Sequence, residues 1–440
     1  MKFDFSDKLV GGFNFEFARG LSTMDIGAAQ IGECFETLER VRNGDFESWI
    51  TNWSATAERV ELYADHAQSE GDFAGAAKAF LRASNYYRMA VFYVAHTDTR
   101  HTTLWQRGKN CFHRMIPLLV RPIEPLHIDF EGAKLPAYFV PCGDGPRPTL
   151  IAMGGFDSTM EELYGFIGCA AADYGWNCLI FEGPGQWSAL KANPGLRFRP
   201  DYERPTAAVV DYALTRPDVD NNKIALIGYS FGGHLAPRAA AGDPRIKACV
   251  ANSIVVDCGA AARAALKKLK NPWLLDRVFS LVMKWNAAVR WGFQHTEWTF
   301  GIHEPHEWFD AYTAFTLKGL EQQFENPMLF LFGVDDIRSS AVSTPQILDD
   351  ILDFILALKC DRSIHLFSRD EGASSHCQMG GLAYARSIIF EWLNHVLSGL
   401  PIKRQFSVSS NEQIVDAFKR YGGGKAAAKA RALLEVVKVF

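Results

Sequence analysis

The stretch that decides the fold is Lys223-Ile-Ala-Leu-Ile-Gly-Tyr-Ser-Phe-Gly-Gly-His-Leu-Ala-Pro-Arg238. Residues 224–227 form a short apolar run that predicts a buried strand, and residues 233–241 predict a helix. The turn between them has the pattern Gly-x-Ser-x-Gly, with Ser230 at its tip. The glycines allow strand and helix to approach closely, and the sharp turn pushes the serine hydroxyl outward. We therefore predict that Ser230 is a nucleophile; the alternative is an idle serine in a glycine-rich turn.

The composition is that of a well-packed soluble enzyme. The chain has 440 residues, of which 48% are apolar and 22% charged, and its formal net charge is -4. This balance argues against nucleic acid or an anionic membrane as a partner. The first residues lack the apolar core of a signal peptide, and the nine cysteines are scattered without a C-x-x-C pair. We therefore expect a cytoplasmic protein with reduced thiols, no metal site and no cofactor.

Residues 1–120 are predicted to form a separate helical domain. The helical pattern covers residues 25–119 and is strongest over 47–70 and 74–95. In the second of these segments apolar residues cover more than one face, which predicts a helix buried on two sides. We interpret this region as an added cap or oligomerisation domain.

Residues 121–400 are predicted to form the catalytic domain, because strand patterns there alternate with helical ones. This order predicts the α/β class, with a mostly parallel, doubly wound sheet. The expected strands after an initial hairpin are 149–153, 177–181, 224–227, 246–251, 328–332 and 363–367.

Two segments depart from that alternation. Residues 257–323 have a helical sequence pattern that is rich in tryptophan. An insertion there would lie over the carboxyl edge of the sheet, where open α/β folds bind ligands. We interpret it as a lid. Residues 401–440 are predicted to be a surface appendage. The tryptophans of the insertion are Trp273, Trp285, Trp291, Trp298 and Trp308.

A serine nucleophile needs a histidine base that is oriented by a carboxylate. In α/β-hydrolases these groups follow the serine in the order acid, then histidine, each in a loop after a late strand. Asp336 lies just beyond the strand at 328–332 and is our candidate acid, with Asp335 as the alternative. His376 follows the strand at 363–367 by nine residues and is our candidate base.

Other histidines compete for that role. His365 lies inside a predicted strand, where a hydrogen-bonded core residue is expected. His234 follows the serine by one helical turn and is expected to pack on the sheet or to contact ligand. His295, His303 and His306 fall in the insertion, and no carboxylate set completes a metal site with them.

The oxyanion formed on attack by Ser230 must be met by preorganised amide groups. The first is expected from Phe231, and the second from the loop Gly154-Gly-Phe-Asp-Ser158, where Phe156 is favoured and Gly155 is the alternative. A plain strand-to-helix turn is the structural alternative for this loop. Candidate substrate contacts are Tyr229, Glu182, Asp157, His234 and Trp298; for Glu182 a purely structural role is equally open.

These motifs together resemble the 2,6-dihydroxypseudooxynicotine hydrolase group of α/β-hydrolases, which includes fungal polyketide-shortening hydrolases of pigment pathways. The resemblance spans residues 20 to 400. It rests on Gly154-Gly-Phe-Asp-Ser158 with Glu161-Glu162, Phe181-Glu-Gly-Pro-Gly-Gln186, Gly228-Tyr-Ser-Phe-Gly-Gly233, Gly333-Val-Asp-Asp336, His376-Cys377 and Ala83-Ser-Asn-Tyr-Tyr-Arg88.

The resemblance implies an α/β-hydrolase fold and hydrolysis of a carbon-carbon bond next to a ketone in an aromatic or polyketide substrate. It also implies a dimer and a catalytic set of Ser230, Asp336 and His376. Two enzymatic alternatives use the same three residues: a carboxylesterase or lactonase, and an acyltransferase or cyclase. A catalytically silent binding protein on the same scaffold is the alternative from another class.

Overall fold

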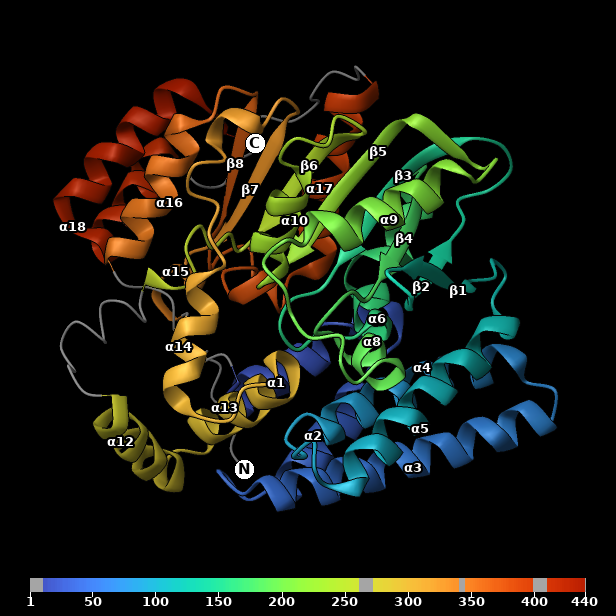
Figure 1. Ribbon diagram of the computed structural model, residues 1–440. Coiled ribbons are helices and arrows are strands. Elements are labelled where there is room, and N and C mark those ends of the chain that lie inside the picture. The colour runs from blue at the N-terminus through green and yellow to red at the C-terminus, as the bar shows by residue number, and fades with distance from the viewer. Residues whose placement is uncertain (1–10, 261–271, 340–344, 399–409, 440) are drawn as a thin grey trace.

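The computed structural model describes residues 11–260, 272–339, 345–398 and 410–439 (Figure 1). Its centre is a nine-stranded sheet with the order β1-β2-β4-β3-β5-β6-β7-β8-β9. β1 and β2 form an antiparallel hairpin, β2 is antiparallel to β4, and all later neighbours are parallel. The strands are β1 Glu124–Phe130, β2 Ala133–Val140, β3 Arg147–Met153, β4 Asn177–Phe181, β5 Val219–Tyr229, β6 Ile246–Asn252, β7 Met328–Gly333, β8 Arg362–Phe367 and β9 Lys438–Val439.

Apolar side chains bury both faces of this sheet. In β5, Ile224 and Leu226 belong to one core and the intervening Ala225 and Ile227 to another, as the two-residue period of a strand requires. Strands covered on both faces read as continuous apolar runs, which is why this one was recognisable. The helices on and between the strands are α6 Met160–Leu163, α7 Cys169–Ala171, α8 Trp187–Ala192, α9 Glu203–Leu214, α10 Gly232–Ala240, α15 Asp336–Ser339, α16 Pro345–Ala357 and α17 Leu382–Ser398.

In the described part of the chain, five α-helices precede the sheet, and Figure 1 shows them packed together at one end of it. α3 and α4 form an antiparallel pair whose starts are capped by aspartates: Asp45 accepts from the Ser48 amide and Asp72 from the Gly75 amide. These helices share one apolar core with α17 and with one face of the sheet. Their bounds are α1 Phe13–Leu21, α2 Ile31–Arg40, α3 Phe46–Ser69, α4 Phe73–Val91 and α5 Thr99–Met115.

The segment between β6 and β7 contains the helices α12 (Pro272–Trp285), α13 (Ala287–Phe300) and α14 (Pro305–Thr313). α13 reaches back to the N-terminal helices, since the Trp291 indole NH donates to the Phe92 carbonyl at 2.7 Å and the two rings stack at 4.4 Å. The insertion therefore contacts the N-terminal helices as well as the sheet.

The C-terminal segment is more than the surface appendage that the sequence suggested. α18 (Asn411–Val436) buries Phe418 against Phe332 of β7, with ring centroids 5.8 Å apart. Lys429 pairs with Asp349 of α16 at 2.5 Å, and β9 pairs with β8. The alanine-rich helix was misjudged because alanines at its buried positions carry little apolar signal. The described part of this tail thus belongs to the catalytic core.

Candidate active site

The turn after β5 holds Ser230 in an unusual backbone conformation. Its φ is 59°, in the left-handed region that non-glycine residues rarely adopt. The close approach of strand and helix requires glycine on both sides: a Cβ on Gly228 would lie 1.9 Å from the Gly232 carbonyl oxygen, and one on Gly232 would lie 2.7 Å from the Gly154 carbonyl oxygen. The serine therefore stands on the sharp corner that its sequence motif predicts.

Three side chains predicted from sequence form one hydrogen-bonded chain. The Ser230 Oγ lies 2.9 Å from Nε2 of His376, and Nδ1 of His376 lies 2.8 Å from Oδ1 of Asp336. Ser253, at the end of β6, donates its hydroxyl to the other oxygen of Asp336 at 2.6 Å. An imidazole thus lies beside the serine hydroxyl and a carboxylate lies on the far side of the imidazole, which is the arrangement that a serine nucleophile needs.

Burial and charge act in opposite directions on His376. Burial disfavours the imidazolium, but the Asp336 carboxylate more than offsets this and holds the pKa of His376 well above its ordinary value. A raised pKa means that the protonated form of the ring is stabilised in the folded protein. Asp336 therefore both orients the His376 ring and stabilises its imidazolium form.

The neighbouring aspartate has a different task. Asp335 is buried and accepts from the Arg369 guanidinium, whose Nε lies 2.9 Å from Oδ1, and from the Ser374 hydroxyl at 2.7 Å. Both partners belong to the loop that leads to His376. Asp335 thus ties the loop before His376 to the end of β7, whereas the hydrogen bond to Nδ1 of His376 comes from Asp336.

The loop 154–158 lies directly against the serine turn. A Cβ on Gly155 would be 2.7 Å from the Phe231 nitrogen and 2.9 Å from the Ser230 Cβ. Gln186 donates to the Gly154 carbonyl at 2.8 Å, and the Gly155 amide donates to the Ser158 hydroxyl at 3.1 Å. Phe231 and Gly155, two of the residues considered as oxyanion donors, are therefore close neighbours.

Two of the five predicted substrate contacts lie in the protein interior. The Tyr229 ring packs against Phe166, with centroids 5.7 Å apart, in the core shared with the N-terminal helices. Glu182 is buried, and its carboxylate accepts from the backbone amides of Met160 and Ser188, at the starts of α6 and α8. Both side chains are engaged in the interior, and the contacts of Glu182 agree with the purely structural role considered from the sequence.

The side chains of the other three candidates are also engaged by protein groups. His234 donates from Nδ1 to the Val255 carbonyl at 2.8 Å, and burial lowers its pKa to about 4. Asp157 pairs with Arg19 at 3.2 Å. Trp298 packs edge-on against the Trp187 ring at 5.0 Å.

Aromatic side chains surround Phe231 and Phe156, the two predicted oxyanion residues. Phe231 contacts Phe198 at a centroid distance of 5.2 Å and Phe315 at 5.2 Å. Phe156 contacts His295 at 4.6 Å, and Phe300 lies 6.4 Å from Phe156. The surroundings of these two residues are consequently apolar and rich in ring faces.

Several residues of the site carried no signal in the sequence. Asn252 accepts the Ser230 amide through its carbonyl at 3.1 Å, and Ser253, with a φ of 64°, reaches Asp336. His295 donates from Nε2 to the Phe156 carbonyl at 2.9 Å, and burial lowers its pKa to about 4. The position of Ser253 directly after a central strand was the one available clue, because neighbouring parallel strands end at the same edge.

The described ranges contain neither a metal-binding cluster nor a membrane-spanning helix. There, no three His, Cys, Asp or Glu side chains gather in a way that could hold a metal ion. None of the helices in that same part of the chain has the length and apolarity to cross a membrane.

Comparisons with known proteins agree with this architecture. Residues 28–284 match the family described as Esterase FrsA-like. Hydrolase acrC of Aspergillus aculeatus is 32% identical over 414 residues, which cover 87% of this chain and 96% of that protein. The 20-hydroxy-prefusarin hydrolase FUS2 of Gibberella moniliformis is 32% identical over 416 residues, which cover 89% and 97%.

Among solved structures, 2,6-dihydroxy-pseudo-oxynicotine hydrolase superposes with a TM-score of 0.67 at 22% identity, covering 86% of this chain and 96% of that one. The family resemblance and the α/β-hydrolase fold predicted from the motifs are both confirmed. The chain belongs to the FrsA-like esterase family, and it is a hydrolase of the α/β-hydrolase class.

Proposed function

We propose that this protein is a serine hydrolase that cleaves a carbon-carbon bond next to a ketone in an aromatic or polyketide-type substrate. Ser230 is the nucleophile, His376 the acid and base, and Asp336 the group that orients His376. The observation that carries the proposal is the continuous hydrogen-bonded chain from Ser230 through His376 to Asp336, with distances of 2.9 and 2.8 Å.

The first half of the reaction acylates the serine. His376 takes the Ser230 proton through Nε2 while Oγ forms a bond to the substrate carbonyl carbon. The resulting oxyanion is met by the amides of Phe231 and Phe156, with Gly155 as the alternative to Phe156. The closeness of Gly155 to the Phe231 nitrogen supports this pairing.

Collapse of the tetrahedral intermediate breaks the bond between the acyl carbon and the next carbon. The electron pair leaves on that carbon, which the adjacent ketone stabilises as an enolate, and the carbon receives the proton that His376 removed from Ser230. Water, deprotonated by His376, then attacks the acyl-enzyme. A carboxylic acid is released and the Ser230 hydroxyl is restored.

The rings around the serine support an aromatic or conjugated substrate. Phe231 and Phe156 would present both their amides and an apolar surface to it, and the helical insertion adds Phe300 at 6.3 Å from Phe231. The names of two similar proteins point the same way: FUS2 is named a 20-hydroxy-prefusarin hydrolase, and the structural neighbour is named a 2,6-dihydroxy-pseudo-oxynicotine hydrolase. For the present chain the substrate class is a proposal.

Ester hydrolysis is the second candidate, and the description of the matched family as esterase-like favours it. The same three residues would act, and an alkoxide leaving group is easier to protonate than a carbanion. The two candidates therefore differ in the bond that breaks, not in the nucleophile.

A matched pair of substrates separates the two candidates. An aryl β-diketone and the methyl ester of the same aryl acid are each incubated with the wild-type protein, and the products are identified by mass spectrometry. Aryl carboxylic acid together with a shortened ketone from the diketone supports carbon-carbon hydrolysis. Turnover of the ester alone would replace it with the esterase.

The homodimer also remains a proposal, since it rests on the family resemblance. Light scattering of the purified protein tests it, and a monomer at micromolar concentration would reject it. The predicted cytoplasmic location is tested by imaging a tagged chain in its native host.

A further inference from the structure

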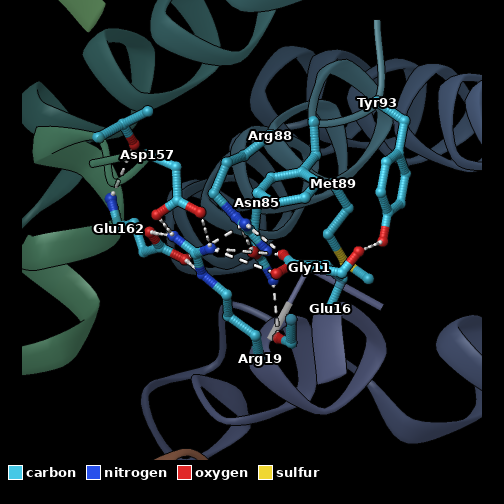
Figure 2. A network of polar contacts seen from close by, with 12 residues as sticks. Gly11, Glu16, Arg19, Asn85, Arg88, Met89, Tyr93, Asp157 and Glu162 are labelled. Atoms are coloured by element: carbon cyan, nitrogen blue, oxygen red, sulfur yellow. Dashed lines mark hydrogen bonds and ion pairs between the residues drawn. The ribbon is translucent and has the colours of Figure 1, made fainter. Parts of the chain in front are cut away.

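Five ionisable side chains form a buried cluster between the N-terminal helices and the catalytic sheet (Figure 2). We call it the buried ion cluster. Glu16, Arg19 and Glu162 expose only 1%, 5% and 3% of their side chains. Charges taken out of water are costly unless they are paired, so the contacts within the cluster must offset the cost of burying its members. Its members are Glu16, Arg19, Arg88, Asp157 and Glu162.

Arg19 of α1 lies at the centre of the cluster, and Figure 2 shows carboxylates on several sides of its guanidinium. It donates through Nε to Glu162 at 2.7 Å. It also spans both oxygens of Asp157, at 3.2 and 3.4 Å, a two-point contact that fixes orientation as well as distance. Arg88 of α4 contacts Glu162 at 3.3 Å and Glu16 at 3.7 Å, and none of its ion pairs in the described chain reaches Asp157.

Asp157 directly follows Phe156, one of the residues proposed to supply an oxyanion amide. The same stretch of backbone is held by neutral donors as well: His295 of α13 binds the Phe156 carbonyl at 2.9 Å, and the Trp187 indole binds the Asp157 carbonyl at 3.1 Å. The charged hold on the loop comes from Arg19. A helix of the N-terminal region therefore acts on the residue adjacent to the reacting centre.

The charges in the cluster favour a firm contact between Arg19 and Asp157. Burial raises the pKa of Glu16 to about 7, so this carboxyl holds a proton for much of its time near neutrality. Burial opposes ionisation of Asp157 too, but Arg19 outweighs it and lowers the pKa of Asp157. Two carboxylates, Asp157 and Glu162, then balance two guanidiniums.

α1 also touches the catalytic histidine, since the Phe15 ring lies 6.2 Å from the His376 ring. The helix that carries Arg19 thus packs against both halves of the candidate site. A shift of α1 would be transmitted to the loop through Asp157.

We propose that Arg19 is a positioning residue for the oxyanion loop, acting through Asp157, so that the N-terminal helices complete the site. The inference rests on the proposed serine mechanism. It goes beyond it by assigning to Arg19 and Asp157 a part in transition-state stabilisation.

An active-serine fluorophosphonate tests the inference without knowledge of the substrate. Phosphonylation of Ser230 places a phosphoryl oxygen where the substrate oxyanion would lie, so its rate reports on the oxyanion amides. The full-length variants are Asp157→Asn, which keeps the shape of the side chain, and Arg19→Lys, which keeps the charge but loses the two-point contact. The matched control is Arg88→Lys, in the same cluster but without contact to Asp157.

We expect Asp157→Asn and Arg19→Lys to lower the maximal phosphonylation rate by about 10- to 100-fold, with the concentration for half-maximal rate changed by less than about threefold. Arg88→Lys is expected to lower the melting temperature but to keep the rate within about threefold of wild type. A structural role alone would make Arg19→Lys and Arg88→Lys equal, and that outcome overturns the inference. A wild-type phosphonylation rate in Asp157→Asn also overturns the inference. If Asp157→Asn does not fold, a wild-type rate in Arg19→Lys overturns it. Absence of labelling in wild type would instead reject the serine mechanism itself.

Discussion

The two halves of the candidate site are held by different parts of the chain. Ser230, Asp336 and His376 follow β5, β7 and β8, which are strands of one sheet. The loop 154–158 also follows a strand, but its hydrogen-bond partners lie on helices outside the sheet. Arg19 of α1 binds its carboxylate, and side chains of α13 and of the start of α8 bind its carbonyls.

The residues of the two halves are therefore positioned in different ways. Parallel strands bring their carboxyl ends to one edge, so the fold itself gathers the serine, the acid and the histidine. The oxyanion loop depends on segments added outside the sheet. We therefore expect substitutions in the first half to abolish activity and substitutions in the second half to reduce it by degrees.

The adjacent aspartates offer the largest expected effect. Asp336→Asn removes the charge that orients His376 and raises its pKa, and we expect kcat to fall by about 10⁴-fold. Asp335→Asn removes a partner of Arg369 instead, and we expect kcat within about tenfold of wild type together with a lower melting temperature. Steady-state kinetics and thermal melts of both variants measure this. Equal losses of kcat would contradict the separate roles of the two carboxylates.

The buried ion cluster predicts a pH dependence of stability. The pKa of Glu16 is about 7 in the folded protein against an ordinary value of 4.5, so the folded state binds its proton more tightly. Stability from this group is present below pH 4.5 and is lost as pH rises toward 7. Between pH 4.5 and 8, Glu16→Gln should therefore gain about 3 kcal/mol relative to wild type in its free energy of unfolding.

Urea unfolding of both proteins at pH 5 and pH 8 measures that difference. Arg88→Lys serves as a comparison, because it disturbs the same cluster without removing a group that titrates in this range. An identical pH dependence in wild type and Glu16→Gln would show that Glu16 keeps its ordinary pKa.

A smaller effect is expected at the contact from α13 to the oxyanion loop. His295→Leu removes the donor to the Phe156 carbonyl, and we expect kcat to fall by about tenfold with KM within about threefold. The control is His303→Gln, an exposed histidine of the same insertion whose ring contacts Glu297. If both variants retain the wild-type kcat, the insertion does not position the loop.

Much of the first half could be predicted from the sequence. The turn at Ser230 has a strict pattern, because a Cβ at Gly228 would strike the Gly232 carbonyl. Asp336 and His376 were chosen from their positions after apolar strands, and the structure brings them to the serine. The choice between Asp335 and Asp336 rested on spacing alone. Adjacent residues at a strand end point in different directions, and the sequence does not show which of the two faces His376.

The contacts that hold the loop 154–158 could mostly not be predicted from the sequence. Arg19 lies 138 residues before Asp157, and nothing local to either residue indicates the pair. The contact of Glu182 could not be predicted for a related reason: its carboxylate binds the Met160 amide, 22 residues away. Contacts between segments depend on how helices pack on the sheet, which a single sequence does not encode in any local pattern.

The nucleophilic role of Ser230 is tested by the turnover of Ser230→Ala on whichever β-diketone or ester the wild-type protein hydrolyses. Ser230→Ala changes one oxygen atom on an otherwise intact fold, which circular dichroism verifies. Our account predicts a loss of at least about 10⁴-fold in kcat with substrate still bound. Turnover by Ser230→Ala at a rate near that of wild type would contradict the nucleophilic role of Ser230.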